Sequence, residues 1–253
     1  MMSAIDDLAI RVLRGCGLQP EPPIDVHLLA KRLGIVEIAE ARLMEDGRLE
    51  RADGQTKILV RRGVSTGRRR FTIAHEIGHL LLAEDTDDLI ARRARLAIGR
   101  EERFCDQFAA AVLLPHDWLR RRYGPRPRRL AVVRELAASA KSSMAAAVIR
   151  LDEVLGWGRS LLRWKPDHGR WRLVAAAAVP PGLHGEIGTA AETCRLLDRI
   201  ASHASADVRL TLPLLVGGTP SRIESELSVT ERTAIALAAL PDSSDGLATN
   251  RRP

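Results

Sequence analysis

The sequence predicts an α+β protein in which a mostly helical core with a small antiparallel sheet is followed by a smaller C-terminal α/β segment. Two patterns carry this prediction. Up to residue 155 most segments place apolar residues at helical spacing, and the stretch between residues 35 and 62 is instead rich in β-branched residues and turn signals. From Leu161 onward the period changes, and strands are expected to mix with helices.

In the N-terminal half, the ends of the expected elements are marked by capping and turn residues. Ser3 and Asp25 are suited to cap two helices, because their side chains can accept hydrogen bonds from the free N–H groups of a first turn. The Asp53–Gly54 pair predicts a tight turn between two strands. The expected elements are helices over 3–13, 26–33, 66–83 and 101–113, a strand over 35–42 and a hairpin over 48–62.

In the C-terminal half, a stiff basic connector at 124–129 gives the first candidate boundary. We expect the following elements: helices over 130–138, 142–155, 189–201 and 230–240, a hairpin over 161–178 and a strand over 208–216. The corresponding division is a domain at 1–124, a helical extension at 125–158, an α/β segment of unassigned role at 159–241 and a tail at 242–253. The polar composition of that tail predicts disorder.

Composition limits the class of protein without choosing a function. The net charge of +7 and the pI of about 10.1 favour acidic partners in general, which include nucleic acid, anionic lipid and acidic protein. The three cysteines are far apart and form no C-x-x-C pair, so reduced thiols are expected. No basic and apolar start is visible, and no apolar run approaches the ~20 residues that cross a membrane. We therefore expect a cytoplasmic protein with no membrane partner.

The residues His75, Glu76 and His79 form an H-E-x-x-H motif inside the helix expected over 66–83. Two histidines four residues apart lie on one helix face, so both imidazoles can reach one zinc ion at ~2.0–2.1 Å. Glu76 is placed to take a proton from water, and zinc lowers the pKa of water and polarises a carbonyl, so the pattern fits peptide hydrolysis. Flanking apolar residues disfavour the alternative of two surface histidines and a solvated glutamate.

Two acidic residues on the next expected helix can complete a zinc site. Glu102 and Asp106 are also four residues apart; Glu102 can supply the third ligand, and Asp106 can fix the tautomer of a ligating histidine. Glu101 competes for the ligand role, and taken alone this pair would favour a solvated acidic face. Tyr123 and His116 are candidate stabilisers of a tetrahedral oxyanion.

The segment from Arg70 to Leu82 and the block from Glu102 to Pro115 resemble the ImmA/IrrE family of metallopeptidases. The family patterns are R-F-T-x-A-H-E-x-G-H and E-x-x-A-[ND]-x-F-A-x-x-L-L-x-P, and this chain reads R-F-T-I-A-H-E-I-G-H and E-R-F-C-D-Q-F-A-A-A-V-L-L-P. One departure is Cys105, where the family commonly has alanine; a small buried hydrophobe is favoured over a redox-sensitive thiol.

The resemblance covers the first half of the chain and implies a function. It implies a gluzincin-like zinc site with His75, His79 and Glu102 as ligands and Glu76 as catalytic base. The implied substrate is a helix-turn-helix repressor, whose cleavage would relieve repression. The rival hypothesis is a non-catalytic regulator that uses the protease fold to bind a repressor or DNA, and the presence of Glu76 argues against it.

Two further features are left open by the sequence. The strand over 58–61 is either an edge strand that pairs with extended substrate, as the resemblance implies, or an interior strand with no free edge. The arginine-rich stretch 92–134 contacts nucleic acid or an acidic substrate, or is a solvated surface. Residues 130–155, which overlap only the end of this stretch, resemble a degenerate helix-turn-helix, although two packing helices are favoured.

Overall fold

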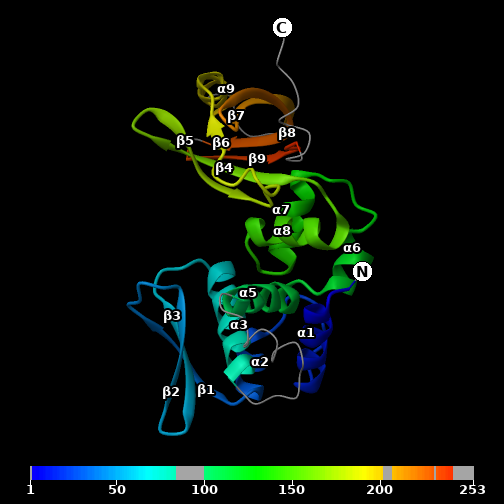
Figure 1. The fold of residues 1–253 in the computed structure, drawn as a ribbon, viewed down its shortest axis with the longest axis vertical. Helices are drawn as coiled ribbons and strands as arrows, with labels where there is room; N and C mark the ends of the chain where they lie inside the picture. The colour runs from blue at the N-terminus through cyan, green and yellow to red at the C-terminus, as the bar shows by residue number, and fades with distance from the viewer. Residues whose placement is uncertain (1, 84–99, 202–206, 231, 242–253) are drawn as a thin grey trace. The chain divides into compact units, whose positions relative to one another are not determined.

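The computed structural model describes residues 2–83, 100–201, 207–230 and 232–241, and the chain divides into two compact units (Figure 1). The first unit holds residues 1–125 and 135–143, and the second holds 126–134 and 144–253. The tail expected at 242–253 lies outside the described residues, and so do Arg92, Arg93 and Arg95 of the arginine-rich stretch.

Helices α3 and α5 form the centre of the first unit, where they lie against one another (Figure 1). Helix α1 packs on α5, and α2 packs on α3. The predicted caps are confirmed, since Ser3 Oγ accepts from the Asp6 N–H and Asp25 Oδ1 accepts from the Leu28 N–H. The helices of this unit are α1 (Ala4–Gly15), α2 (Val26–Arg32), α3 (Thr66–Ala83), α5 (Arg100–Leu113) and α6 (His116–Tyr123).

The sheet of the first unit has the strand order β1-β3-β2. Its strands are β1 (Ile35–Ala41), β2 (Gly47–Ala52) and β3 (Gln55–Arg61). The expected hairpin is confirmed, because β2 runs antiparallel to β3, but β1 runs parallel to β3. The sheet is therefore mixed, and the expectation of a purely antiparallel one is wrong. The strand over 58–61 is interior, and the edges of the sheet are β1 and β2.

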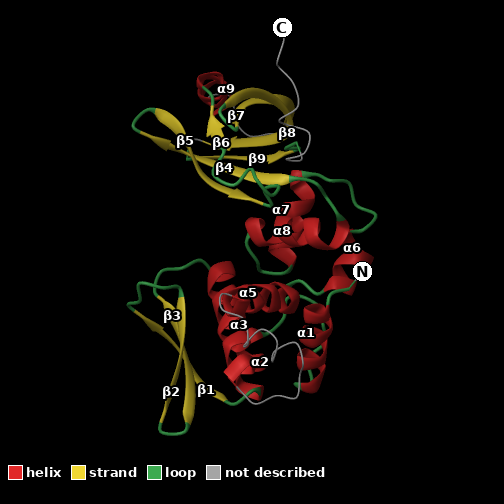
Figure 2. Cartoon of the chain, viewed as in Figure 1, coloured by secondary structure: helices red, strands yellow, loops and turns green. Residues whose placement is uncertain are grey.

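A six-stranded antiparallel sheet dominates the second unit, in the order β5-β4-β9-β8-β7-β6 (Figure 2). One face carries a core that includes the fully buried Trp164, Leu212 and Leu227, and Leu197 of α9 packs into it. The strands are β4 (Ser160–Asp167), β5 (Arg170–Ala177), β6 (Ile187–Thr189), β7 (Val208–Val216), β8 (Thr219–Thr230) and β9 (Thr233–Ala238). Two helices precede these strands in the chain, α7 (Leu130–Ser139) and α8 (Met144–Leu155), and α9 (Ala191–Ala201) lies between β6 and β7. The residues of α7 are divided between the two units.

The prediction of a helix over 230–240 is wrong. These residues include the end of β8 and the central strand β9. Ala234, Ala236 and Ala238 are all fully buried on one face of β9, which pairs with β4 on one side and β8 on the other. Pairing on both sides overrides the helix propensity of alanine. The C-terminal segment consequently has the larger sheet of the two units.

Within the described residues, no helix is both long enough and apolar enough to span a bilayer.

The contact between α3 and α5 depends on Gly78. A Cβ atom at Gly78 would lie 3.0 Å from the Cα and 3.1 Å from the Sγ of Cys105. We predict that Gly78→Ala lowers the free energy of unfolding by about 1–3 kcal/mol, because overpacking must push the two helices apart. Urea unfolding would measure this. Gly15→Ala is the matched control: Gly15 ends α1 with open space around it, so its replacement should leave stability equal or higher. Equal losses in both variants would contradict the prediction.

Candidate metal centre

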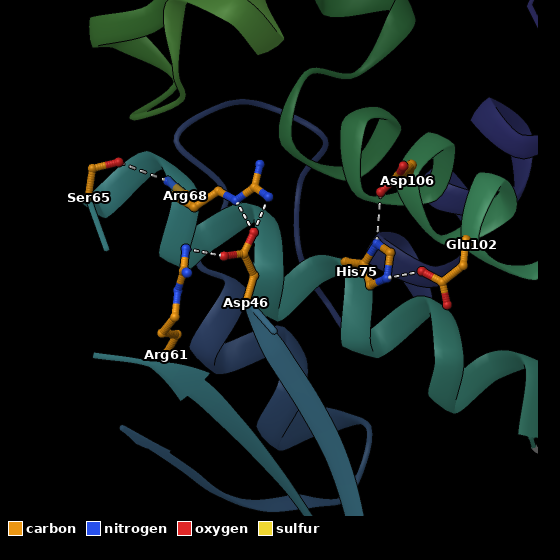
Figure 3. Close-up of polar contacts among 7 residues, drawn as sticks. All are labelled: Asp46, Arg61, Ser65, Arg68, His75, Glu102 and Asp106. Carbon is orange, nitrogen blue, oxygen red and sulfur yellow. Dashed lines mark hydrogen bonds and ion pairs between the residues drawn. The ribbon is translucent and has the colours of Figure 1, made fainter. Parts of the chain in front are cut away.

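Three side chains converge at the point where α3 and α5 meet, and Figure 3 shows two of them, His75 and Glu102. The Nε2 atoms of His75 and His79, one helical turn apart on α3, are 3.2 Å from one another. Glu102 of α5 places Oε2 3.3 Å from His75 Nε2 and Oε1 3.2 Å from His79 Nε2. The predicted ligand trio is thus brought together, and the carboxylate that reaches both imidazoles comes from Glu102. Glu101 lines the groove beside it.

The spacing of these donor groups fits a tetrahedral metal ion. Ligand atoms at ~2.0–2.2 Å from zinc are ~3.3–3.5 Å from one another in a tetrahedron. The three separations of 3.2–3.3 Å come close to that spacing. The Glu102 side chain is 71% exposed, so one side of the trio is open to solvent, as a catalytic metal site requires.

Cys105 offers a competing donor. Its Sγ and the ring nitrogens of His75 and His79 all lie within 4.8 Å of one another. The thiol is fully buried, and this burial, followed by the charges of Glu102 and Glu76, raises its pKa well above the ordinary value. Metals bind the thiolate, which a raised pKa disfavours. Cys105 also packs against Gly78, so its small size serves the helix contact, and Glu102 is the better third donor.

Asp106 orients the ring of His75. Its Oδ1 lies 2.9 Å from His75 Nδ1 (Figure 3), which leaves Nε2 of that ring facing His79 and Glu102. Burial by itself lowers the pKa of His75, but the hydrogen bond and charge of Asp106, with smaller contributions from Glu76 and Glu102, outweigh it and raise that pKa. Burial, and then the charge of His75, lower the pKa of His79, which favours the neutral imidazole that a metal binds.

Glu76 is a buried carboxylate whose side chain is directed to the opposite wall of the site. The residue is 6% exposed and accepts a hydrogen bond from the backbone of Leu49 on β2. Burial raises its pKa from 4.5 to about 7, against the opposing charge of His75. Because a general base works best with a pKa near the working pH, this environment suits proton transfer at neutrality.

A groove of about 840 Å³ is lined by His75, Glu76, His79 and Glu102. Strand β2 and the loop before it form one wall, and α3 with the start of α5 forms the other. The strand can approach α3 only because residue 47 is glycine: a Cβ there would lie 2.2 Å from Thr72 Cγ2 and 2.9 Å from Glu76 Oε1. The groove therefore places the β2 edge of the sheet next to Glu76.

Asp46 fixes the start of β2 against the helix. It accepts hydrogen bonds from Arg61 of β3 at 2.5 Å and from Arg68 of α3, whose Nε lies 2.6 Å away (Figure 3). The roles of Asp46 and Gly47 are not visible in the sequence. An Asp–Gly pair signals only a turn, and their partners lie 15 to 29 positions further along the chain.

The two candidate oxyanion stabilisers lie elsewhere on α6. Tyr123 is fully buried, contacts Trp118 and lies 3.5 Å from Ser139 Oγ. His116 is buried and its Nδ1 lies 3.0 Å from an Asp117 oxygen. Neither is among the described residues that line the groove, so we leave both out of the candidate site.

Comparison with known proteins places this site within a family. The sequence model of the IrrE N-terminal-like domain matches residues 30–152, just under half of the chain, and this range contains the groove, both histidines and Glu102. This part of the chain belongs to the ImmA/IrrE family.

Two curated relatives within this family are named radiation response metalloprotease IrrE. The one from Deinococcus radiodurans is 38% identical over 104 residues, which are 38% of this chain and 30% of that protein. The one from Deinococcus deserti is 40% identical over 103 residues, covering 38% of this chain and 36% of that protein. The match thus spans about a third of each relative's length. A solved Mycobacterium tuberculosis transcriptional regulator has a similar fold, with a TM-score of 0.53 over 92% of this chain and 74% of its own, at 15% identity.

We predict that Asp106→Asn lowers metal affinity about 10–100-fold, because the amide leaves the His75 ring less firmly oriented and less basic. Competition with a chromophoric chelator would measure the dissociation constant of zinc. Glu50→Gln on β2 is the control, since that side chain lies outside the groove lining and should leave affinity unchanged. Unchanged affinity in Asp106→Asn would contradict a role in orienting His75.

The burial of Glu76 also predicts a pH-dependent stability. A carboxyl group with a pKa of 4.5 in the unfolded chain and about 7 in the fold lowers stability once it ionises. The loss is absent below about pH 4.5, grows through the interval and is complete above about pH 7. Metal-free Glu76→Gln should therefore exceed the wild type by about 1–3 kcal/mol near pH 8 and match it near pH 4.5. Urea unfolding with a chelator present would measure both differences, and an equal difference at the two pH values would contradict the burial argument.

Proposed function

We propose that this chain is a zinc-dependent endopeptidase, in which His75, His79 and Glu102 hold the metal and Glu76 is the general base. The observation that carries the proposal is the position of Glu76: a buried carboxylate with a pKa near neutrality opens into the same groove as three converging donor groups. When bound, the metal would lower the pKa of water and polarise the scissile carbonyl. Family membership and the metalloprotease names of the relatives support the same reaction class.

The chain's own residues would divide the remaining work. Glu76 takes the proton from the attacking water and then delivers it to the leaving amine. Asp106 keeps His75 in one tautomer. The hydrogen bond from Leu49 holds the Glu76 carboxylate beside the edge strand, so the base stays in place while substrate binds.

Strand β2 is the proposed binding site for the substrate backbone. It pairs only with β3, so among the described residues its other edge is free, and this edge lines the groove. An extended peptide can add to such an edge through main-chain hydrogen bonds, with side chains alternating between groove and solvent. The segment to be cleaved would therefore be unfolded or a flexible loop.

We propose a helix-turn-helix repressor as the substrate, on the basis of the family resemblance. Direct contact with DNA stays a prediction for the arginine-rich stretch. Of its described residues, Arg120, Arg121 and Arg122 are exposed on α6, and Arg121 lies 4.0 Å from a Glu21 oxygen.

Replacement of the base separates an enzyme from a binding protein. Glu76→Gln keeps the shape of the side chain but cannot accept the proton, so cleavage of a repressor encoded beside this protein should fall by at least ~10²-fold. Zinc content should stay near that of the wild type, whereas His79→Ala should lose both zinc and cleavage. Fragment formation and a reporter of repression would be followed together, with Glu37→Gln, an exposed carboxylate of β1 outside the groove, as the control for loss of a carboxylate. Relief of repression that survives Glu76→Gln without any fragment would favour the non-catalytic regulator.

A further inference from the structure

A second hollow, of about 450 Å³, lies on the six-stranded sheet of the second unit. It shares no lining residue with the groove of the metal centre. Its lining consists of three arginines, two glutamates and the sheet residues between them: Arg128, Arg159, Arg209, Glu224, Glu226, Leu210, Thr211, Ser225 and Leu237. The lining of the hollow is therefore mostly polar, with one more arginine than glutamate.

The sheet register builds the floor of this hollow. Arg209 of β7 faces Glu226 of β8, and Thr211 faces Glu224 two residues along, so these four side chains share one face of the sheet. Leu212, the residue that follows Thr211, points to the opposite face of the sheet and is fully buried in the core. The position of Arg209 is consequently fixed by strand pairing.

The buried carboxylate of Glu226 anchors the connector that carries Arg128. Glu226 is 6% exposed; its Oε2 accepts a hydrogen bond of 2.7 Å from the backbone N–H of Leu130, and its Oε1 lies 3.4 Å from the guanidinium of Arg129. These contacts hold the start of α7 on β8. They place Arg128, the residue before Arg129, at the hollow. The guanidinium of Arg129 also neutralises the charge of Glu226.

Arg159 enters the hollow from a turn that is fixed in a similar way. The N–H of Gly158 donates to Asp152 Oδ1 at 2.6 Å. Gly158 has a φ of +55°, a backbone angle that residues other than glycine rarely adopt. Ser160 then begins β4. Three separate segments thus converge, each held by its own backbone or carboxylate anchor.

The three arginines of the hollow lie near Glu224 and Glu226 without pairing with either. In the described parts of the chain, no ion pair joins Arg128, Arg159 or Arg209 to a carboxylate. By contrast, Arg134 in the same unit is paired with Asp207 at 2.5 Å. Three guanidinium groups around one hollow repel one another, and an anion that binds between them would relieve this repulsion.

We propose that this hollow binds a small phosphate ester. Guanidinium groups form paired hydrogen bonds with phosphate oxygens, and three of them match a multiply charged group. The volume lies within the roughly 300–1,000 Å³ typical of small-molecule sites. Glu224, on the same floor and exposed, would accept hydrogen bonds from hydroxyl or amino groups of the ester. A polyanionic nucleic-acid backbone fits less well, because Glu224 and Glu226 place negative charge beside the arginines.

Isothermal titration of the full chain with inorganic pyrophosphate tests the arginine end of the site. We expect saturable binding that Arg159→Ala and Arg209→Ala each weaken about 10-fold or more, as expected for loss of a charge-assisted hydrogen bond. Glu224→Gln should strengthen pyrophosphate binding, because it removes a negative charge from the hollow. Arg163→Ala is the matched control: Arg163 is an exposed arginine of β4 outside the lining, and its loss should leave binding unchanged.

Several outcomes would overturn the proposal. One is the absence of saturable pyrophosphate binding by a wild-type protein that circular dichroism shows to be folded. Equal weakening by Arg163→Ala would indicate attraction by net charge alone. If Glu224→Gln binds pyrophosphate no more tightly than the wild type, Glu224 does not lie beside the bound anion and the proposed site is wrong. A short duplex DNA that binds through Arg159 and Arg209, and that pyrophosphate does not displace, would identify a nucleic-acid surface instead.

Discussion

Helices α3 and α5 meet backbone to backbone at Gly78 and Cys105, and the geometry of the metal centre follows from this contact. The histidines lie one turn before and at the position after Gly78, while Glu102 and Asp106 lie on either side of Cys105 in the chain. A larger residue at either position would increase the helix separation. An increase of only a few tenths of an ångström acts directly on the 2.9–3.3 Å separations between the imidazoles and the carboxylates. Packing and chemistry are thus set by the same pair of small residues.

The site concentrates ionisable groups in a partly dry environment, and their opposite responses to burial give them different roles. Burial raises the pKa of Glu76 toward neutrality, whereas in His75 the neighbouring carboxylate Asp106 outweighs burial. Burial and the charge of His75 both lower the pKa of His79, which favours its neutral form. A divalent cation would change this balance, because it stabilises ionised carboxylates and expels protons from imidazoles. Metal binding and proton affinity are therefore tightly linked in this groove.

The local part of the site could be predicted from the sequence, and the long-range part could not. Two i, i+4 pairs on consecutive helices fix which faces carry His75, His79, Glu102 and Asp106, because helical periodicity is a local property. Nothing local indicates that Asp46 reaches Arg68, or that Gly47 lies against Glu76. In the second unit the alanines of β9 favour a helix when read alone, and only pairing with strands on both sides makes them β. The parallel position of β1 beside β3 is hidden for the same reason.

An open strand edge that accepts one extended chain can in principle accept any, including a second copy of the same protein. Strand β2 counters this with charge, since its sequence Gly-Arg-Leu-Glu-Arg-Ala contains three ionisable side chains in six residues. Arg48 is already engaged by Glu45 at 2.5 Å and lies 3.9 Å from Glu50, so these groups stay hydrated and resist stacking against an identical edge. The charges of the strand thus disfavour pairing with an identical edge, while Gly47, at the groove end of the same strand, lets its backbone approach Glu76 closely.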